Sequence, residues 1–134
     1  MHIAKQLMVI PGVIAAGEYA YRGDRYTCEG NLTDEYARMA SILCRANTLN
    51  VSMQAEMFSA FAEHCDCRPL QGWIVRGKQI SVCAVGNFFC LLENRQGVLN
   101  DVVTIMRAMV GDISDDVMKV MYSKIGGDVT EQLV

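Results

Sequence analysis

The sequence predicts a single α+β domain built on a five-stranded antiparallel sheet with helices on both faces. Apolar residues recur at helical spacing in four segments, and β-branched and aromatic residues gather in five short runs. Short glycine-containing turns join neighbouring runs, which favours antiparallel pairing. The 134 residues are close to the commonest domain size. We expect one domain over residues 1–112, with a C-terminal helix and tail over 113–134 appended to it.

The N-terminal segment is predicted to form a short helix and a hairpin. Residues 2–10 carry aliphatic side chains on one helical face, and Pro11-Gly12 is expected to end the helix. Residues 13–22 and 25–29 have the composition of strands. Gly23-Asp24 between them predicts a two-residue turn.

Three further strands and two helices are predicted for the C-terminal half. The strands are expected over residues 70–76, 79–85 and 88–94. Glycine opens both of their short connections, Gly77-Lys78 and Gly86-Asn87, which predicts an antiparallel meander. An amphipathic helix is expected over 98–110, and Ser114 is placed to cap a last helix over 114–126.

The longest helix is predicted to begin after the N-cap Thr33 and to run to about His64. At a rise of 1.5 Å per residue an unbroken helix would span roughly 46 Å. A domain of this size is only about 36 Å across. The helix therefore either ends early or extends beyond its own domain, where only a partner would cover it.

The side chains of this helix predict an unusually wide apolar arc, roughly 200° against the ordinary 100°. The expected polar face holds Arg38, Ser41, Arg45, Thr48, Ser52, Glu56, Ser59 and Glu63. One apolar lobe holds Met39, Ile42, Leu49, Met53, Met57 and Ala60, and the other holds Tyr36, Ala40, Leu43, Val51, Phe58 and Phe61. An amide strip of Asn47, Asn50 and Gln54 separates the lobes. Either the helix is buried deep in one core, or, as we favour, one lobe meets a partner molecule.

Composition narrows the function classes. The chain is 51% apolar with a net charge of −3 and has no basic stripe, which argues against nucleic-acid binding. Its apolar runs are far shorter than the roughly 20 residues needed to cross a bilayer, so no membrane insertion is expected. The N-terminus lacks the layout of a secretory signal, which predicts a cytoplasmic protein.

The six cysteines are expected to be reduced, and four of them have the surroundings of core positions. The exception is the run His64-Cys65-Asp66-Cys67, where His64, Cys65 and Cys67 are candidate metal ligands or a redox pair. A structural zinc site needs a fourth ligand and no second cluster exists in the sequence. The favoured interpretation is a helix end with two incidental thiols, and no cofactor is expected.

Motifs for catalysis are absent from the sequence. The glycine spacing of Gly12 to Gly17 matches a phosphate loop, but Glu18-Tyr19 stands where lysine and a hydroxyl residue must meet the phosphate. No Gly-x-Ser-x-Gly occurs, and the two histidines give few candidates for a nucleophile–base pair. We therefore expect a non-enzymatic protein.

Three segments together resemble the roadblock/LC7 family, in particular an uncharacterised prokaryotic branch. The first is the helix-to-strand step at residues 7–18, which reads LMVIPGVIAAGE. The second is Ala46-Asn47-Thr48-Leu49, and the third runs from Gly72-Trp73 through residues 81–87. They span roughly residues 3–110 in the family's order and spacing.

The resemblance implies a profilin-like fold, with the long helix on one face and the terminal helices on the other. It also implies a homodimer in which the long helices pack side by side and the third strands pair. The interface residues carried over are Met39, Ile42, Leu49, Met53, Met57, Ala60, Leu70, Trp73 and Ile74. Family members regulate or scaffold small Ras-like GTPases without catalytic residues. The alternatives are a thiol- or metal-responsive protein and a sensor that holds a small ligand on the sheet.

Overall fold

The computed structural model describes residues 3–61 and 70–110. The elements are α1 (Ile3–Leu7), β1 (Val13–Tyr19), β2 (Tyr26–Gly30), α2 (Asp34–Phe61), β3 (Gly72–Arg76), β4 (Ile80–Val85), β5 (Phe88–Glu93) and α3 (Val98–Val110). The five strands form one sheet in the order β2-β1-β5-β4-β3, and every neighbouring pair is antiparallel. The predicted α+β class and five-stranded sheet are confirmed, and the arrangement is consistent with a profilin-like fold.

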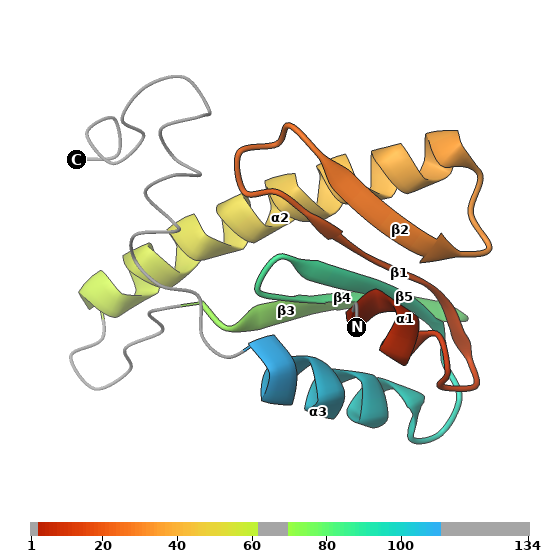
Figure 1. Cartoon of the computed structure of the whole chain (residues 1–134). Helices are drawn as coiled ribbons and strands as arrows, with labels where there is room; N and C mark the ends of the chain where they lie inside the picture. The colour runs from red at the N-terminus through yellow and green to blue at the C-terminus, as the bar shows by residue number, and fades with distance from the viewer. Residues whose placement is uncertain (1–2, 62–69, 111–134) are drawn as a thin grey trace.

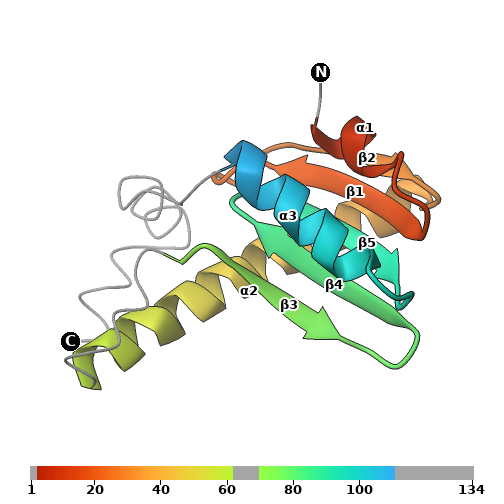
Figure 2. The same ribbon diagram turned by 90° about the horizontal axis from the view of Figure 1, so that it is seen from below.

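Helices cover the two faces of the sheet unequally. The long helix α2 lies on one face, and α1 and α3 lie side by side on the other (Figures 1 and 2). In both views the C-terminal turns of α2 project past the strands. Within the described part of the chain, no helix is both long and apolar enough to cross a membrane.

Two hydrophobic clusters fill the spaces between these layers. On the side of α1 and α3, the buried members include Leu7, Leu92, Val102 and Met106. On the side of α2, the buried members are Tyr19, Cys44, Ala84 and Phe89. The first cluster takes its helical residues from two short helices with ordinary apolar faces. The second takes only small residues from α2 (Cys44 and the adjacent Ala40), which determines what α2 leaves exposed.

The β1–β2 hairpin differs from the predicted one. The strands end at the pair Tyr19 and Tyr26, so the connection has six residues instead of the predicted two. Inside it, the Ala20 amide donates to the Arg25 carbonyl (2.8 Å). The Arg45 guanidinium of α2 donates to the Tyr21 carbonyl (2.9 Å). This bond to a distant helix holds the wider loop in place.

The meander of β3, β4 and β5 follows the prediction. Gly86-Asn87 is a two-residue turn, in which Gly86 has a positive φ of 61°. At the other end, the Asn94 side chain donates to the Gly77 carbonyl (2.7 Å) and accepts from the Ser81 hydroxyl (2.6 Å). These bonds fix the β3–β4 connection, and with it the position of β3 at the edge of the sheet. The predicted helix over 114–126 lies outside the described residues.

Candidate functional site

The side of α2 that faces the sheet is lined mostly by small residues, with Leu49 as the one large side chain. Its buried members are Ala37, Ser41, Cys44, Thr48, Leu49, Ser52 and Ala55. The expectation that Ser41, Thr48 and Ser52 lie on a solvent-facing polar side is therefore wrong. Small side chains let a helix approach a sheet closely, and the hydroxyls can be buried because they find hydrogen-bond partners.

Thr48 is the best-connected of these hydroxyls. Its Oγ1 accepts from the Trp73 indole N–H at 2.8 Å and lies 2.8 Å from the Tyr19 hydroxyl, which is also 3.3 Å from the Gly86 carbonyl. Burial raises the pKa of the Tyr19 hydroxyl well above its ordinary value, so it remains a neutral donor. Thr48 thus ties α2 to β1 and, through Trp73, to β3.

Most large side chains of the two apolar lobes, Leu49 excepted, consequently lie on the side of α2 away from the sheet. Exposed large hydrophobic side chains run along its whole length, each 42% to 80% exposed: Tyr36, Met39, Ile42, Leu43, Met57, Phe58 and Phe61. Met39 and Met57 each lie nine residues from Thr48, which is two and a half turns. They are therefore diametrically opposite the hydroxyl that faces the sheet. We call this surface, defined by the seven exposed residues, the outward face of α2.

Strand β3 is an apolar sheet edge beside α2. Among the described strands only β4 pairs with it, and Ile74 and Val75 are 49% and 55% exposed. Alternation along the strand puts Val75 on the same side as Trp73, the side of α2. No charged side chain occurs between Gly72 and Val75, whereas charges commonly block free edges against pairing. The other edge, β2, carries an exposed Glu29.

The predicted interface residues are distributed unevenly. Met39, Ile42, Met57, Ala60 and Ile74 are exposed, and Met53, Leu70 and Trp73 are half-buried. Leu49 is only 7% exposed and has almost no surface left for a partner. The prediction left out Tyr36, Leu43, Phe58, Phe61 and Val75, which the structure exposes beside the others.

The thiols of the described residues are poorly placed for chemistry. Cys44, Cys83 and Cys90 are buried and Cys28 is half-buried, and all four are free. Burial raises the pKa of Cys44 and of Cys83 to about 12, so neither forms the reactive thiolate near neutral pH. Among residues 3–61 and 70–110, no group of three or more His, Cys, Asp or Glu side chains could hold a metal. The run His64 to Cys67 lies outside the described residues.

The phosphate-loop spacing also has a structural explanation. Gly12 has a positive φ of 99° in the turn before β1, where a side chain would be strained. Gly17 lies inside β1, and a Cβ there would be 2.3 Å from the Thr27 carbonyl oxygen and 2.7 Å from the Phe89 ring. Both glycines therefore serve backbone geometry and close packing.

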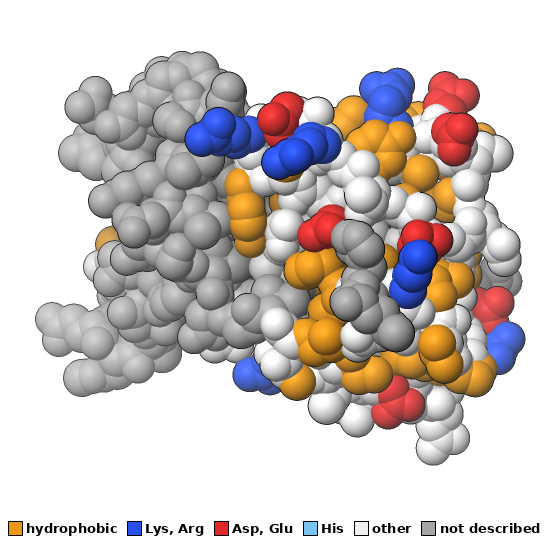
Figure 3. Space-filling view, viewed as in Figure 1, with side chains coloured by type: hydrophobic (Ala, Val, Ile, Leu, Met, Phe, Trp, Pro, Cys, Tyr) orange, Lys and Arg blue, Asp and Glu red, His pale blue; other side chains and the backbone are white. Residues whose placement is uncertain are grey.

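Surface charge adds no single-sign patch on the face seen in Figure 3, where acidic and basic side chains are interspersed. The main non-polar feature of the described surface is thus the outward face of α2 together with the β3 edge. The candidate site is therefore an exposed apolar surface on an α+β domain.

The chain belongs to the family of uncharacterized conserved proteins DUF2173, whose model matches residues 3–108. The match covers α1 through nearly all of α3, and so includes the whole sheet and α2. No curated protein and no solved structure gives a significant match.

Proposed function

We propose that this chain is a non-enzymatic homodimeric interaction module of the roadblock/LC7 type. The observation that carries the proposal is which side of α2 faces the sheet. Mostly small residues face the sheet, and most of the large apolar residues point outward. Extended exposed apolar patches mark interaction sites in soluble proteins. A partner that covers this helix supplies the burial that the chain's own sheet does not.

A second copy of the chain is the partner that the surface fits. A two-fold axis requires a self-complementary patch, in which residue i contacts j and j contacts i. Met39 and Met57 lie at equal distances along α2 from the level of Thr48. If two antiparallel α2 helices cross at that level through their outward faces, Met39 of one copy meets Met57 of the other. The β3 edge, which no further described strand pairs with, lies beside α2 and can pair with its own copy, so that the sheet extends across the axis.

The proposed role of the dimer is to regulate or scaffold a small Ras-like GTPase. Support for this comes from the resemblance of residues 7–18, 46–49 and 72–87 to the roadblock/LC7 family, whose members act in this way. The order of helices and strands agrees with the fold that this resemblance implies.

Sedimentation velocity of the full chain at micromolar concentration tests the dimer. We expect a species of twice the 14.9 kDa chain mass, with a monomer appearing on dilution. A monomer throughout the micromolar range would contradict the proposal, since the outward face of α2 would then be stable in water without a partner.

The GTPase role needs a separate measurement. Small Ras-like GTPases of the same host, loaded with GDP or with a non-hydrolysable GTP analogue, are mixed with the purified chain. We expect co-elution in one nucleotide state, or a changed rate of GTP hydrolysis. If no host GTPase gives either result while the chain is dimeric, the dimer stands and the GTPase role is wrong.

A further inference from the structure

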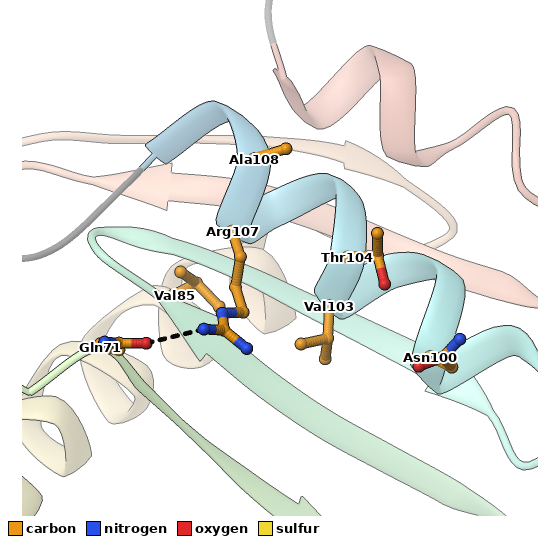
Figure 4. A pocket seen from close by; sticks show the side chains of 7 residues that line it. All are labelled: Gln71, Val85, Asn100, Val103, Thr104, Arg107 and Ala108. Atoms are coloured by element: carbon orange, nitrogen blue, oxygen red, sulfur yellow. Dashed lines mark hydrogen bonds between the residues drawn. The ribbon is translucent and has the colours of Figure 1, made fainter.

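A cavity of about 440 Å³ opens beside α3, on the opposite face of the sheet from α2 (Figure 4). Its lining residues come from α3, the end of β4 and the residue before β3: Gln71, Val85, Asn100, Val103, Thr104, Arg107 and Ala108. The cavity is open to solvent, since its polar lining residues and Ala108 are exposed. The cavity lies away from the outward face of α2 and approaches the proposed dimer surface only at Gln71, the residue before β3.

The cavity exists because α3 covers only part of its face of the sheet. Val102 and Met106 point into the core over β4 and β5, while β3 extends beyond the helix. The β3 residue that pairs with Val85 is Gly72, which adds no side chain above it. The cavity therefore lies between the side of α3 and the corner of the sheet where β3 and β4 pair.

The polar and apolar groups of the lining are arranged along one stripe of α3. Residues 100, 103, 104 and 107 recur at spacings of three and four, so they share one flank of the helix. Val85, Val103 and Ala108 give the cavity an apolar portion. Asn100 and Thr104 contribute neutral groups that can donate or accept hydrogen bonds.

Arg107 gives the cavity its electrostatic character. It is the only ionisable side chain among the described residues that line the cavity, in a chain whose net charge is −3. Its Nη2 donates to the Gln71 Oε1 at 3.1 Å, which draws the guanidinium across from α3 toward the start of β3 (Figure 4). A guanidinium has five N–H donors in a planar fork, so most remain for a carboxylate.

We propose that this cavity binds a small organic anion, a carboxylate with an apolar body. The carboxylate pairs with the Arg107 guanidinium, and the apolar body lies against Val85 and Val103. Arg107 has no acidic neighbour in the described lining, so the cavity favours a negatively charged ligand. The apolar part of the lining favours an organic anion over an inorganic ion. The site lies on the α3 side of the sheet, so it does not depend on the proposed dimer.

Titration of the ¹⁵N-labelled full chain with sodium hexanoate and sodium benzoate, followed by amide chemical shifts, tests the site. Hexanamide and inorganic phosphate serve as the uncharged and the purely ionic comparison. We expect saturable shifts that map to the lining residues for both carboxylates, and weaker binding of hexanamide and of phosphate. R107Q keeps a side chain that can still bond to Gln71, and should weaken carboxylate binding at least about tenfold.

Two further variants complete the design. R22Q makes the same substitution at an exposed arginine in the β1–β2 connection, and should leave carboxylate affinity unchanged. A108W fills the cavity from an exposed position on α3. It should abolish carboxylate binding without unfolding the chain, as checked by circular dichroism. Equal binding of hexanamide and hexanoate, equal binding by R107Q, or an absence of saturable shifts would each overturn the proposal. The oligomeric state is measured in the same samples, so this failure is distinguishable from failure of the dimer.

Discussion

Leu43→Asp is the sharpest test of the outward face of α2. Leu43 is 64% exposed and lies in the middle of that face, away from the sheet. Full burial of a leucine side chain contributes about 1.5–3 kcal/mol. Covering the exposed 64% therefore contributes about 1–2 kcal/mol in each copy, and about 2–4 kcal/mol in a two-fold dimer.

Loss of this contribution corresponds to a dimer dissociation constant raised by about 30-fold to roughly 1000-fold. Desolvation of two introduced carboxylates acts in the same direction. The monomer itself should lose under about 1 kcal/mol, the difference in helix propensity between leucine and aspartate. Sedimentation velocity over a concentration series measures the dissociation constant, and circular dichroism checks the helix content.

Val9→Asp is the matched control, because Val9 is 80% exposed and follows α1 on the other side of the sheet. It should leave the dissociation constant unchanged. If L43D dimerises as tightly as the unaltered chain, the outward face of α2 is not the dimer surface. If V9D and L43D weaken the dimer equally, the effect is one of added charge and the assignment is wrong.

Two predictions concern the interior. Thr48→Val removes the acceptor of the Trp73 indole N–H, and should lower the free energy of unfolding in urea by about 1–3 kcal/mol and shift the tryptophan emission. The buried thiols should make stability fall at alkaline pH. Burial raises the pKa of Cys44 and of Cys83 from an ordinary 9 to about 12. Above pH 9 the unfolded chain therefore loses thiol protons that the folded chain keeps, which favours unfolding. Each thiol should then cost about 1.4 kcal/mol of stability between pH 7 and pH 10.

Each of these two predictions has its own control. Thr104→Val makes the same change at an exposed position on α3 and should alter stability by less than about 0.5 kcal/mol. An unchanged stability in T48V would show that the hydroxyl does not hold β3 to α2. For the thiols, Cys44→Ala should reduce the loss between pH 7 and pH 10 by the share of one thiol. A stability that is flat to pH 10 would contradict the burial argument.

The regular parts of the fold were predictable because local signals agree with the tertiary structure. Thr33 was expected to cap the long helix, and its Oγ1 accepts from the Tyr36 amide at 3.2 Å. The helix over 98–110 and the strand pair around Gly86-Asn87 have the expected bounds within a residue. The six-residue β1–β2 connection was not predictable, because Arg45, 24 positions from Tyr21, helps to hold it.

The orientation of α2 was the main feature that the sequence pattern concealed. Hydropathy treats serine and threonine as polar, so a stripe that includes Ser41, Thr48 and Ser52 was assigned to solvent. Beside a sheet, however, size matters as much as polarity, and hydroxyls can be buried when they bond to nearby groups. The Ser41 hydroxyl donates to the Arg38 carbonyl of its own helix at 2.8 Å. The signal that was available is the regular recurrence of small residues from Ala37 to Ala55 at spacings of three and four.

The cavity beside α3 left no signal in the sequence. Its residues come from three separate segments, and only the edge position of β3 brings them together. Arg107 by itself has the pattern of an ordinary solvated arginine near a helix C-terminus.

The hydroxyl of Thr48 has a consequence for the speed at which the proposed dimer forms. Because the Thr48 oxygen accepts from both the Trp73 indole of β3 and the Tyr19 hydroxyl of β1, hydrogen bonds within the single chain already hold α2 in place against the sheet. Little ordering remains to be done at contact, so the entropic penalty of docking is small. We therefore expect association of two copies to be limited by diffusion and mutual orientation, and substitutions on the proposed interface to change mainly the dissociation rate.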